Sequence, residues 1–390
     1  MYEEIDRYLH RLIAQSGPDY TAWNVERIRQ GKSANWNYID GCMMTALLAM
    51  AEITGREEYF DFVEGFLSSF VGEDGTIRTY DPTKYNLDDI NEGRVLLPLY
   101  RATGKEKYLL AAGRLMEQLT HQPRTREGSF WHKQIYPNQV WLDGIYMAQV
   151  FYAQYQKQTG GSYRDILEQL ATVRKRMFSP EKQLYYHGYD AEKRAFWADP
   201  VTGCSASFWL RSIGWFSVAL ADLLEILPEP EARPVAEMFR ELMAGIAGYR
   251  EPETGMYYQV PDQGSRPGNY LETSGSSMVA YAMLKGARLG FLPKEYAAKG
   301  AKTFDGIVRT KLHFDGESLN LEGICLVAGL GPENNRRRNG TFEYYISEPV
   351  VSNDAKGVAP LPAVLYGNPA AHSSLIFTLV SSGPWSALWS

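Results

Sequence analysis

The sequence has little cysteine and no closely spaced pair of cysteines. Cys42, Cys204 and Cys325 are the three cysteines among 390 residues, and they lie far apart. Because the number is odd and no Cys-x-x-Cys, His-x-x-His or His-Glu-x-x-His motif exists, neither a disulfide framework nor a zinc site is expected. Reduced, mostly buried thiols in a reducing compartment are expected instead.

Long hydrophobic runs and an excess of basic residues are also missing. The segment from Met1 to Arg7 is charged and amphipathic, unlike a secretory signal, and no stretch is apolar enough to span a membrane. We therefore expect a cytoplasmic protein with no membrane partner. The formal net charge of −6 argues against a nucleic-acid partner, so an anionic ligand would need locally placed positive charge.

Neither a linker nor a cofactor motif interrupts the chain. No Pro/Gly/Ser-rich stretch or charge block divides it, which predicts one domain over residues 1–390. There is no Gly-x-Gly-x-x-Gly, Walker-type loop or Gly-x-Ser-x-Gly elbow. We therefore expect no nucleotide, metal or other cofactor and no serine nucleophile.

What the sequence does contain is a repeat of about 50 residues. Each copy has a threonine and a glycine after a long apolar segment, followed by an amphipathic one, as at Thr54-Gly55, Thr103-Gly104 and Thr159-Gly160; Leu289-Gly290 is a looser copy. Glycine is typical just after a helix ends, so each copy predicts the tip of a helical hairpin.

The two helices of each predicted hairpin differ in character. The first is apolar nearly all round, as in residues 43–50, 145–152, 213–224 and 278–284. The second is apolar on one side only, as shown by Tyr59, Val63 and Phe66 at helical spacing. Enclosed inner helices and amphipathic outer helices predict an all-α, double-walled (α/α) barrel.

Short aromatic loops lead into each inner helix, and polar residues stand where these helices begin. We expect the loops and helix starts to share one end of the barrel. Asp40, Asp88 and Asp143 lie at such starts, where an aspartate can either cap the helix or act chemically. Asp143 has the apolar surroundings that keep a carboxylic acid protonated, and Asp88 could supply a like charge.

Tryptophans and one arginine accompany these aspartates. Trp141, Trp209 and Trp215 either belong to the core or stack against a sugar. Arg211 lies on an otherwise apolar helix, so it needs an anionic partner from the protein or from a ligand. His132, Lys133 and His187 fit carboxylate binding, with solvated loop residues as the alternative. Ser274, in a Ser-Gly-Ser-Ser run, fits hydrogen bonding to a ligand.

Several segments together resemble the unsaturated rhamnogalacturonyl hydrolases, which remove the unsaturated uronic acid from lyase-cut pectin. These segments are Tyr85-Asn86-Leu87-Asp88-Asp89, Trp141-Leu142-Asp143, His187-Gly188-Tyr189-Asp190, residues 209–215 and residues 272–277. The resemblance implies six helical hairpins, Asp143 as general acid and Asp88 as its carboxylate partner. Segment 339–357 also resembles the late segment of this family, although the residues themselves do not indicate its role.

The function expected from the resemblance is hydrolysis of unsaturated uronyl oligosaccharides from rhamnogalacturonan at their non-reducing end. An acid would protonate the ring double bond, and water would then add to the ring. Two alternatives remain open at this point. One is a conventional glycosidase that uses two carboxylates on a saturated glycan, and the other is a helical-repeat binding protein without catalysis.

Overall fold

The computed structural model describes residues 2–316 and 318–362. Within residues 38–311 the chain forms five helical hairpins, each an inner element followed by an outer helix. The inner elements are α3 (Tyr38–Thr54), η2 and α5 (Leu87–Val95 and Leu96–Thr103), α7, η3 and α8 (Leu142–Gly144, Ile145–Gln149 and Val150–Thr159), α10 (Leu210–Ile226) and α12 (Thr273–Arg288). The outer helices are α4 (Glu57–Phe70), α6 (Glu106–His121), α9 (Arg164–Met177), α11 (Ala232–Ala247) and α13 (Glu295–Lys311).

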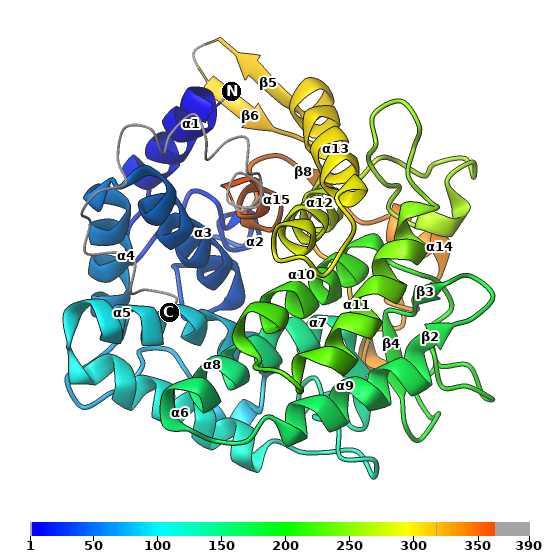
Figure 1. Ribbon diagram of the computed structural model, residues 1–390, viewed down its shortest axis with the longest axis horizontal. Helices are drawn as coiled ribbons and strands as arrows, with labels where there is room; N and C mark the ends of the chain where they lie inside the picture. Colours follow the sequence, from blue (N-terminus) through cyan, green and yellow to red (C-terminus); the bar gives the residue numbers. More distant parts are fainter. Residues whose placement is uncertain (1, 317, 363–390) are drawn as a thin grey trace.

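The inner elements form a closed ring. Each contacts the next in the order α3, η2, η3, α10 and α12, and α15 (Ala355–Val358) contacts both α12 and α3. Figure 1 shows the outer helices surrounding this ring. The expected all-α double-walled barrel is therefore confirmed. Its buried wall explains why the inner helices are apolar on every side.

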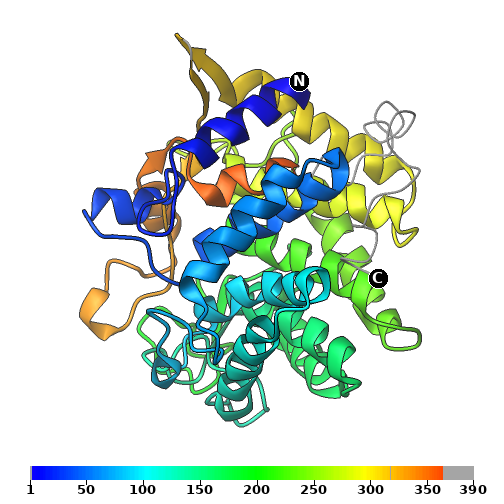
Figure 2. The same ribbon diagram turned by 90° about the vertical axis from the view of Figure 1, so that its left-hand side faces the viewer.

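Both ends of the described chain make the sixth position of the barrel. Helix α1 (Tyr2–Ala14) supplies the outer layer and α15 the inner one, and Figure 2 shows them near each other. The Tyr8 hydroxyl donates a hydrogen bond to Asn353 Oδ1 at 2.6 Å. Lys356 Nζ lies 2.7 Å from Oε1 of Glu26, which belongs to α2 (Val25–Arg29). Residues far apart in sequence therefore close the ring.

The hairpin tips have the expected conformation. Gly55, Gly104 and Gly160 end their helices with φ values of 66°, 68° and 71°. A residue with a Cβ is strained at such φ values, which explains the glycine in each repeat. The predicted helical hairpins are thus confirmed at the residues that suggested them.

Short strands and turns replace helices at the other end of the barrel, opposite the tips. Four two-stranded antiparallel pairs occur in the described chain: β1 (Gln139–Trp141) with β4 (Gly188–Asp190), β2 (Phe178–Ser179) with β3 (Leu184–Tyr185), β5 (Leu312–Asp315) with β6 (Ser318–Leu321), and β7 (Ile324–Cys325) with β8 (Val350–Val351). The remaining elements are α14 (Phe342–Ile346) and the 3-10 turns η1 (Pro82–Lys84), η4 (Pro261–Gln263) and η5 (Glu333–Asn335).

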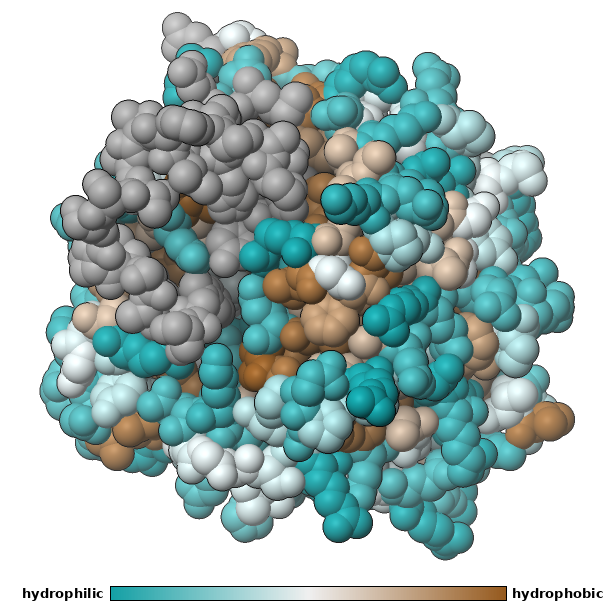
Figure 3. Space-filling model, in the orientation of Figure 1, coloured by the Kyte–Doolittle hydropathy of each residue, from teal (hydrophilic) through white to brown (hydrophobic). Residues whose placement is uncertain are grey.

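The face seen in Figure 3 is mostly hydrophilic at its periphery, and hydrophobic residues gather near its centre. No helix of the described residues is long and apolar enough to cross a membrane. Cys42, Cys204 and Cys325 are all buried and unpaired, as the sequence predicted.

Candidate active site

A cavity opens at the end of the barrel where the inner helices begin. Asp88 and Asp143 line it together with most of the other predicted site residues. The complete lining consists of Tyr38, Asp88, His132, Lys133, Tyr136, Trp141, Asp143, Met147, Trp209, Arg211, Trp215, Val327, Ala328 and Arg338. The expectation that helix starts and loops converge at one end of the barrel therefore agrees with the structure.

Pairing of β1 with β4 positions three of the predicted residues. Trp141 is opposite Gly188 in this pair, and the Leu142 backbone N–H donates to the His187 carbonyl at 3.1 Å. Asp143 follows at once in α7, and its helix continues as the π-helical turn η3. Such π turns are rare and are frequent at functional sites. The pairing thus brings the Asp143 carboxylate next to the His187 ring.

Asp143, His187 and Tyr345 form a buried chain of polar groups. Asp143 Oδ2 lies 3.1 Å from His187 Nε2, and neither atom has another hydrogen-bond partner among the described residues. On the other side of the ring, His187 Nδ1 lies 2.6 Å from the Tyr345 hydroxyl. Because Tyr345 belongs to α14, the late segment contributes to the site by orienting His187.

Asp88 lies between two basic residues. Its Oδ2 is 2.5 Å from Lys133 Nζ, and its Oδ1 is 3.5 Å from His132 Nε2. Burial opposes the charge of Asp88, but Lys133 and His132 outweigh that effect and lower the pKa of the carboxyl group. Burial also lowers the pKa of His132 to about 4, so its imidazole is neutral near pH 7.

Helix capping does not explain these aspartates. The side chains of Asn37 and Asn86 cap α3 and η2, and no backbone N–H of the described residues donates to the Asp143 carboxylate. Asp40 accepts hydrogen bonds from Thr21 and Trp23, at 3.0 and 2.8 Å. These bonds use the oxygens of Asp40 inside the protein, and Asp40 does not line the cavity, so its contact with a ligand stays a prediction.

Aromatic rings form much of the cavity wall. Trp141 stacks on His132 with ring centroids 4.3 Å apart and on Tyr136 at 4.8 Å. Trp209 and Trp215 line the opposite side, although both are almost completely buried. Both tryptophans therefore pack in the core and also line the cavity, and their stacking against a sugar stays a prediction.

Arg211 is held by the protein without a direct carboxylate partner. Its Nη1 donates to the Cys325 carbonyl and, at 3.3 Å, to the Ser274 hydroxyl, and its Nη2 lies 3.4 Å from the Leu326 carbonyl. The Glu272 carboxylate, which accepts a hydrogen bond from the same Ser274 hydroxyl, compensates part of the charge of Arg211. Arg211 therefore brings a partly compensated positive charge to the cavity wall.

Ser274 and His187 act behind the cavity wall and do not line it. The Ser274 hydroxyl donates to Glu272 at 2.7 Å and supports Arg211. His187 is fully buried between Asp143 and Tyr345. Direct ligand contact by either residue stays a prediction, and the structure shows that each hydrogen-bonds a group that is itself at or beside the site.

Sequence reasoning missed Arg338. This half-buried residue lines the cavity, and no group of the described chain accepts a hydrogen bond from its guanidinium. A run of three arginines, from Arg336 to Arg338, in an acidic protein was the available signal. Tyr136, in a loop, and Tyr38, the first residue of α3, were missed as well, because a single tyrosine carries no distinctive pattern.

The cavity combines two carboxylates, stacked aromatic rings and three cationic side chains at one end of an (α/α) barrel. Carboxylate pairs perform acid–base work on sugars, and aromatic rings bind sugar faces. The fold and site together are therefore typical of a glycoside hydrolase.

The sequence comparison gives the family. The sequence profile of Glycosyl Hydrolase Family 88 matches residues 14–366, so the chain belongs to that family. The chain is 45% identical over 184 residues to Protein Atu3128 of Agrobacterium fabrum, covering 46% of this chain and 78% of that protein. It is 24% identical over 264 residues to the unsaturated rhamnogalacturonyl hydrolase YesR of Bacillus subtilis, covering 65% of this chain and 72% of YesR.

Solved structures agree with this assignment. A Family 105 glycoside hydrolase from C. acetobutylicum superposes with a TM-score of 0.84 at 37% identity, covering 94% of this chain and 99% of that one. The unsaturated glucuronyl hydrolase of Bacillus sp. GL1 superposes with a TM-score of 0.63 at 16% identity, covering 95% and 98%. The second likeness shows the shared fold alone.

Proposed function

We propose that this glycoside hydrolase removes the unsaturated uronic acid from the non-reducing end of rhamnogalacturonan oligosaccharides released by a lyase. The observation that carries the proposal is the placement of Asp143 and Asp88 in one cavity with Arg211 and Arg338. An acid next to cations that have no direct carboxylate partner suits a sugar that carries both a reactive double bond and a carboxylate.

The name of the relative YesR supports rhamnogalacturonan as the substrate, and the Family 105 neighbour fits it. Buried, unpaired cysteines support a cytoplasmic location, because a reducing compartment keeps thiols free. Oligosaccharides produced elsewhere would then be degraded after uptake.

The chemistry begins with Asp143 as a carboxylic acid. Its proton is transferred to C4 of the ring double bond, and positive charge develops at C5 and the ring oxygen. A water molecule adds at C5 and returns a proton to the Asp143 carboxylate. The resulting hemiketal opens and releases the neighbouring sugar, so that one water is consumed for each bond cleaved. General acid–base catalysis of this kind contributes roughly 10²–10⁴-fold.

His187, supported by Tyr345, can hydrogen-bond Asp143 both before and after Asp143 gives up its proton. When Asp143 is protonated, it can donate to His187 Nε2, and Nδ1–H then donates to the Tyr345 oxygen. When Asp143 is ionised, Nε2–H donates to it and the tyrosine hydroxyl donates to Nδ1. Because the Tyr345 hydroxyl can rotate, the hydrogen-bonded chain is compatible with both protonation states of Asp143.

A conventional glycosidase acting on a saturated glycan is the second candidate, because two carboxylates line the cavity. The ion pair between Asp88 and Lys133 disfavours it, since a carboxylate held by a lysine is a poor nucleophile or base. The binding-protein alternative does not agree with membership of a hydrolase family.

Absorbance of the conjugated double bond in the ultraviolet tests the proposal. The purified protein should remove this absorbance from lyase-generated rhamnogalacturonan oligosaccharides, while releasing one sugar per double bond lost. An ordinary glycosidase would release sugar without changing the absorbance. If the absorbance is retained and the protein cleaves a saturated glycan, the second candidate function is correct and our proposal is wrong.

A further inference from the structure

Two irregular helices carry the acidic groups of the candidate active site. Asp88 belongs to η2, a 3-10 helix of nine residues, and Asp143 directly precedes the π-helical turn η3. A 3-10 helix longer than about four residues is uncommon, because its hydrogen bonds are poorer than those of an α-helix. The relative position of the two aspartates is therefore expected to depend on side chains that link η2 to η3 and to the regular helices around them.

Arg94, near the end of η2, makes such a link. It is 4% exposed, and its Nη2 atom lies 2.5 Å from Oδ2 of Asp222, which belongs to the 17-residue helix α10. Its Cζ atom lies 5.0 Å from the centroid of the Tyr146 ring, and Tyr146 is part of η3. One buried side chain thus joins the three elements that position the two aspartates and Arg211.

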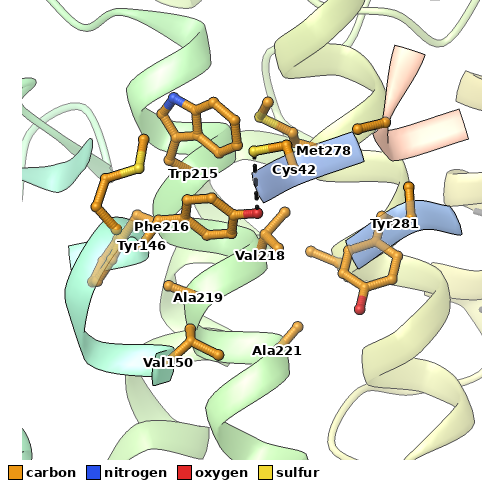
Figure 4. Packing of buried hydrophobic residues seen from close by; sticks show 14 of the residues in the cluster. Cys42, Tyr146, Val150, Trp215, Phe216, Val218, Ala219, Ala221, Met278 and Tyr281 are labelled. Carbon is orange, nitrogen blue, oxygen red and sulfur yellow. Dashed lines mark hydrogen bonds between the residues drawn. The ribbon is translucent and has the colours of Figure 1, made fainter. Parts of the chain in front are cut away.

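The contact with Tyr146 extends to the wall of the active-site cavity. The Tyr146 ring stacks on that of Trp215, with ring centroids 4.5 Å apart, and Trp215 lines the cavity. Figure 4 shows the two rings one above the other, with the Tyr146 hydroxyl directed toward Cys42 of α3. Met147, the next residue of η3, lines the same cavity. A shift of Tyr146 would therefore move two parts of the cavity wall.

The planar guanidinium of Arg94 suits this double contact. Its Nε and Nη1 atoms have no hydrogen-bond acceptor among the described residues, and the face of an aromatic ring attracts a cation of this kind. Asp222 also accepts hydrogen bonds from Lys285 and Tyr281, at 2.8 and 2.7 Å, and Lys285 lies 2.6 Å from Glu225. Each cation of this cluster thus has a carboxylate partner. A lysine in place of Arg94 could keep the ion pair but could not lie flat on the ring as well.

We infer that Arg94 is a positioning residue for catalysis, which holds η2 and η3 in the arrangement that places Asp88 and Asp143 at the substrate. The identity of the reaction rests on the proposed function, whereas the contacts of Arg94 lie outside the active-site cavity. Arg94 does not line that cavity, so it acts through Tyr146 and Asp222. Its loss should lower kcat with a much smaller change in KM, because the cations of the cavity keep their own contacts.

Arg94→Leu should lower kcat roughly ten- to hundredfold, since a displacement of about 1 Å between reacting groups can cost this much. Asp222 keeps Lys285 as its partner in this variant, so the carboxylate is not left unpaired.

Lys285→Leu is the matched control. It removes a buried cation from the same carboxylate, and afterwards Asp222 keeps Arg94 while Glu225 keeps Arg288 at 3.0 Å. Both variants should lower the thermal unfolding temperature, but only Arg94→Leu should lower kcat.

Protein labelled with ¹³C at the methionine methyl groups gives a second readout that needs no substrate. The Met147 signal, assigned with Met147→Leu, should shift in Arg94→Leu and keep its position in Lys285→Leu. Arg94→Lys should also lower kcat and shift this signal. Because it keeps the ion pair with Asp222, it tests the role of Arg94 even if Arg94→Leu does not fold.

The positioning role is overturned if a folded Arg94 variant has the wild-type kcat, if its Met147 signal does not move, or if Lys285→Leu lowers kcat as much. A wild-type protein that is inactive on the unsaturated oligosaccharides would instead contradict the proposed function. In that case the Met147 signal would still decide whether Arg94 positions η3.

Discussion

The Nε2 atom of His187 lies 3.1 Å from Oδ2 of Asp143, and Tyr345 contacts the opposite edge of the same ring. The histidine therefore fixes the direction of the carboxylate that we propose as the acid. This arrangement depends on pairing of β1 with β4 and on α14, which is far away in sequence.

Asp143→Asn should lower kcat by roughly 10²–10⁴-fold, because an amide cannot donate the proton. Its thermal unfolding temperature and its affinity for substrate should stay close to those of the wild type, since Asp143 caps no helix. Ultraviolet absorbance gives the rate and calorimetric titration the affinity. Near-normal turnover would remove Asp143 from the mechanism.

Asp88→Asn should reduce the rate strongly and shift the acid limb of the pH–rate profile. Lys133 and His132 keep the pKa of Asp88 below its usual range, so the wild-type side chain is charged at neutral pH. Removal of that charge leaves Lys133 without its partner and changes the field at Asp143. A profile and rate equal to those of the wild type would contradict this role.

Tyr345→Phe should lower kcat about tenfold with little change in KM, because it removes only the hydroxyl that supports His187. The His187 tautomer, measured by ¹⁵N NMR, should change in parallel. Tyr344→Phe in the same helix is a matched control, since the Tyr344 hydroxyl instead accepts from the Gly329 backbone. Equal effects of both variants would indicate a general structural role.

Arg211→Ala and Arg338→Ala separate the two cations that could bind the uronate. A charge-assisted contact is worth about 1.5–3 kcal/mol, so loss of the true partner should raise KM about 10–100-fold. Methyl esterification of the substrate should weaken binding to the wild type and matter much less to that variant. If both variants remain as sensitive to esterification as the wild type, Lys133 is the next candidate.

Stability should depend on pH through His132. Burial lowers its pKa to about 4, so between pH 4 and its unfolded value near 6.5 the unfolded chain binds the extra proton. The free energy of unfolding should therefore rise by about 3 kcal/mol across this interval. His132→Phe keeps the stack on Trp141 and should flatten this part of the curve, as measured by urea unfolding at several pH values.

Local patterns in the sequence were sufficient for the architecture. Gly55, Gly104 and Gly160 mark helix ends because their positive φ values are adopted poorly by other residues. The inner helices are apolar on all sides because they are enclosed by the rest of the barrel. The clustering of Asp88, Trp141, Asp143 and Arg211 followed from placing all helix starts at one end. These inferences need only spacing and chemistry.

Pairings between distant residues were not predictable in this way. The ion pair of Lys133 with Asp88, the use of Asp40 by Trp23 and the arrival of Arg338 at the cavity depend on how loops fold over the barrel. Lys133 and Asp40 were recognised from the sequence as candidate site residues, and Arg338 was overlooked. In each case the surrounding groups come from another part of the chain. Only the three-dimensional contacts assign those partners.

Closure of the ring by α1 and α15 has a consequence for biosynthesis. The bond from Tyr8 to Asn353 joins residues separated by 345 positions, so it cannot form until almost the whole barrel has left the ribosome. Until then α3 and α12 lack the neighbour that covers their apolar sides. A nascent chain with such an open seam exposes hydrophobic surface for a long time, and it should therefore associate with chaperones until α15 emerges and inserts.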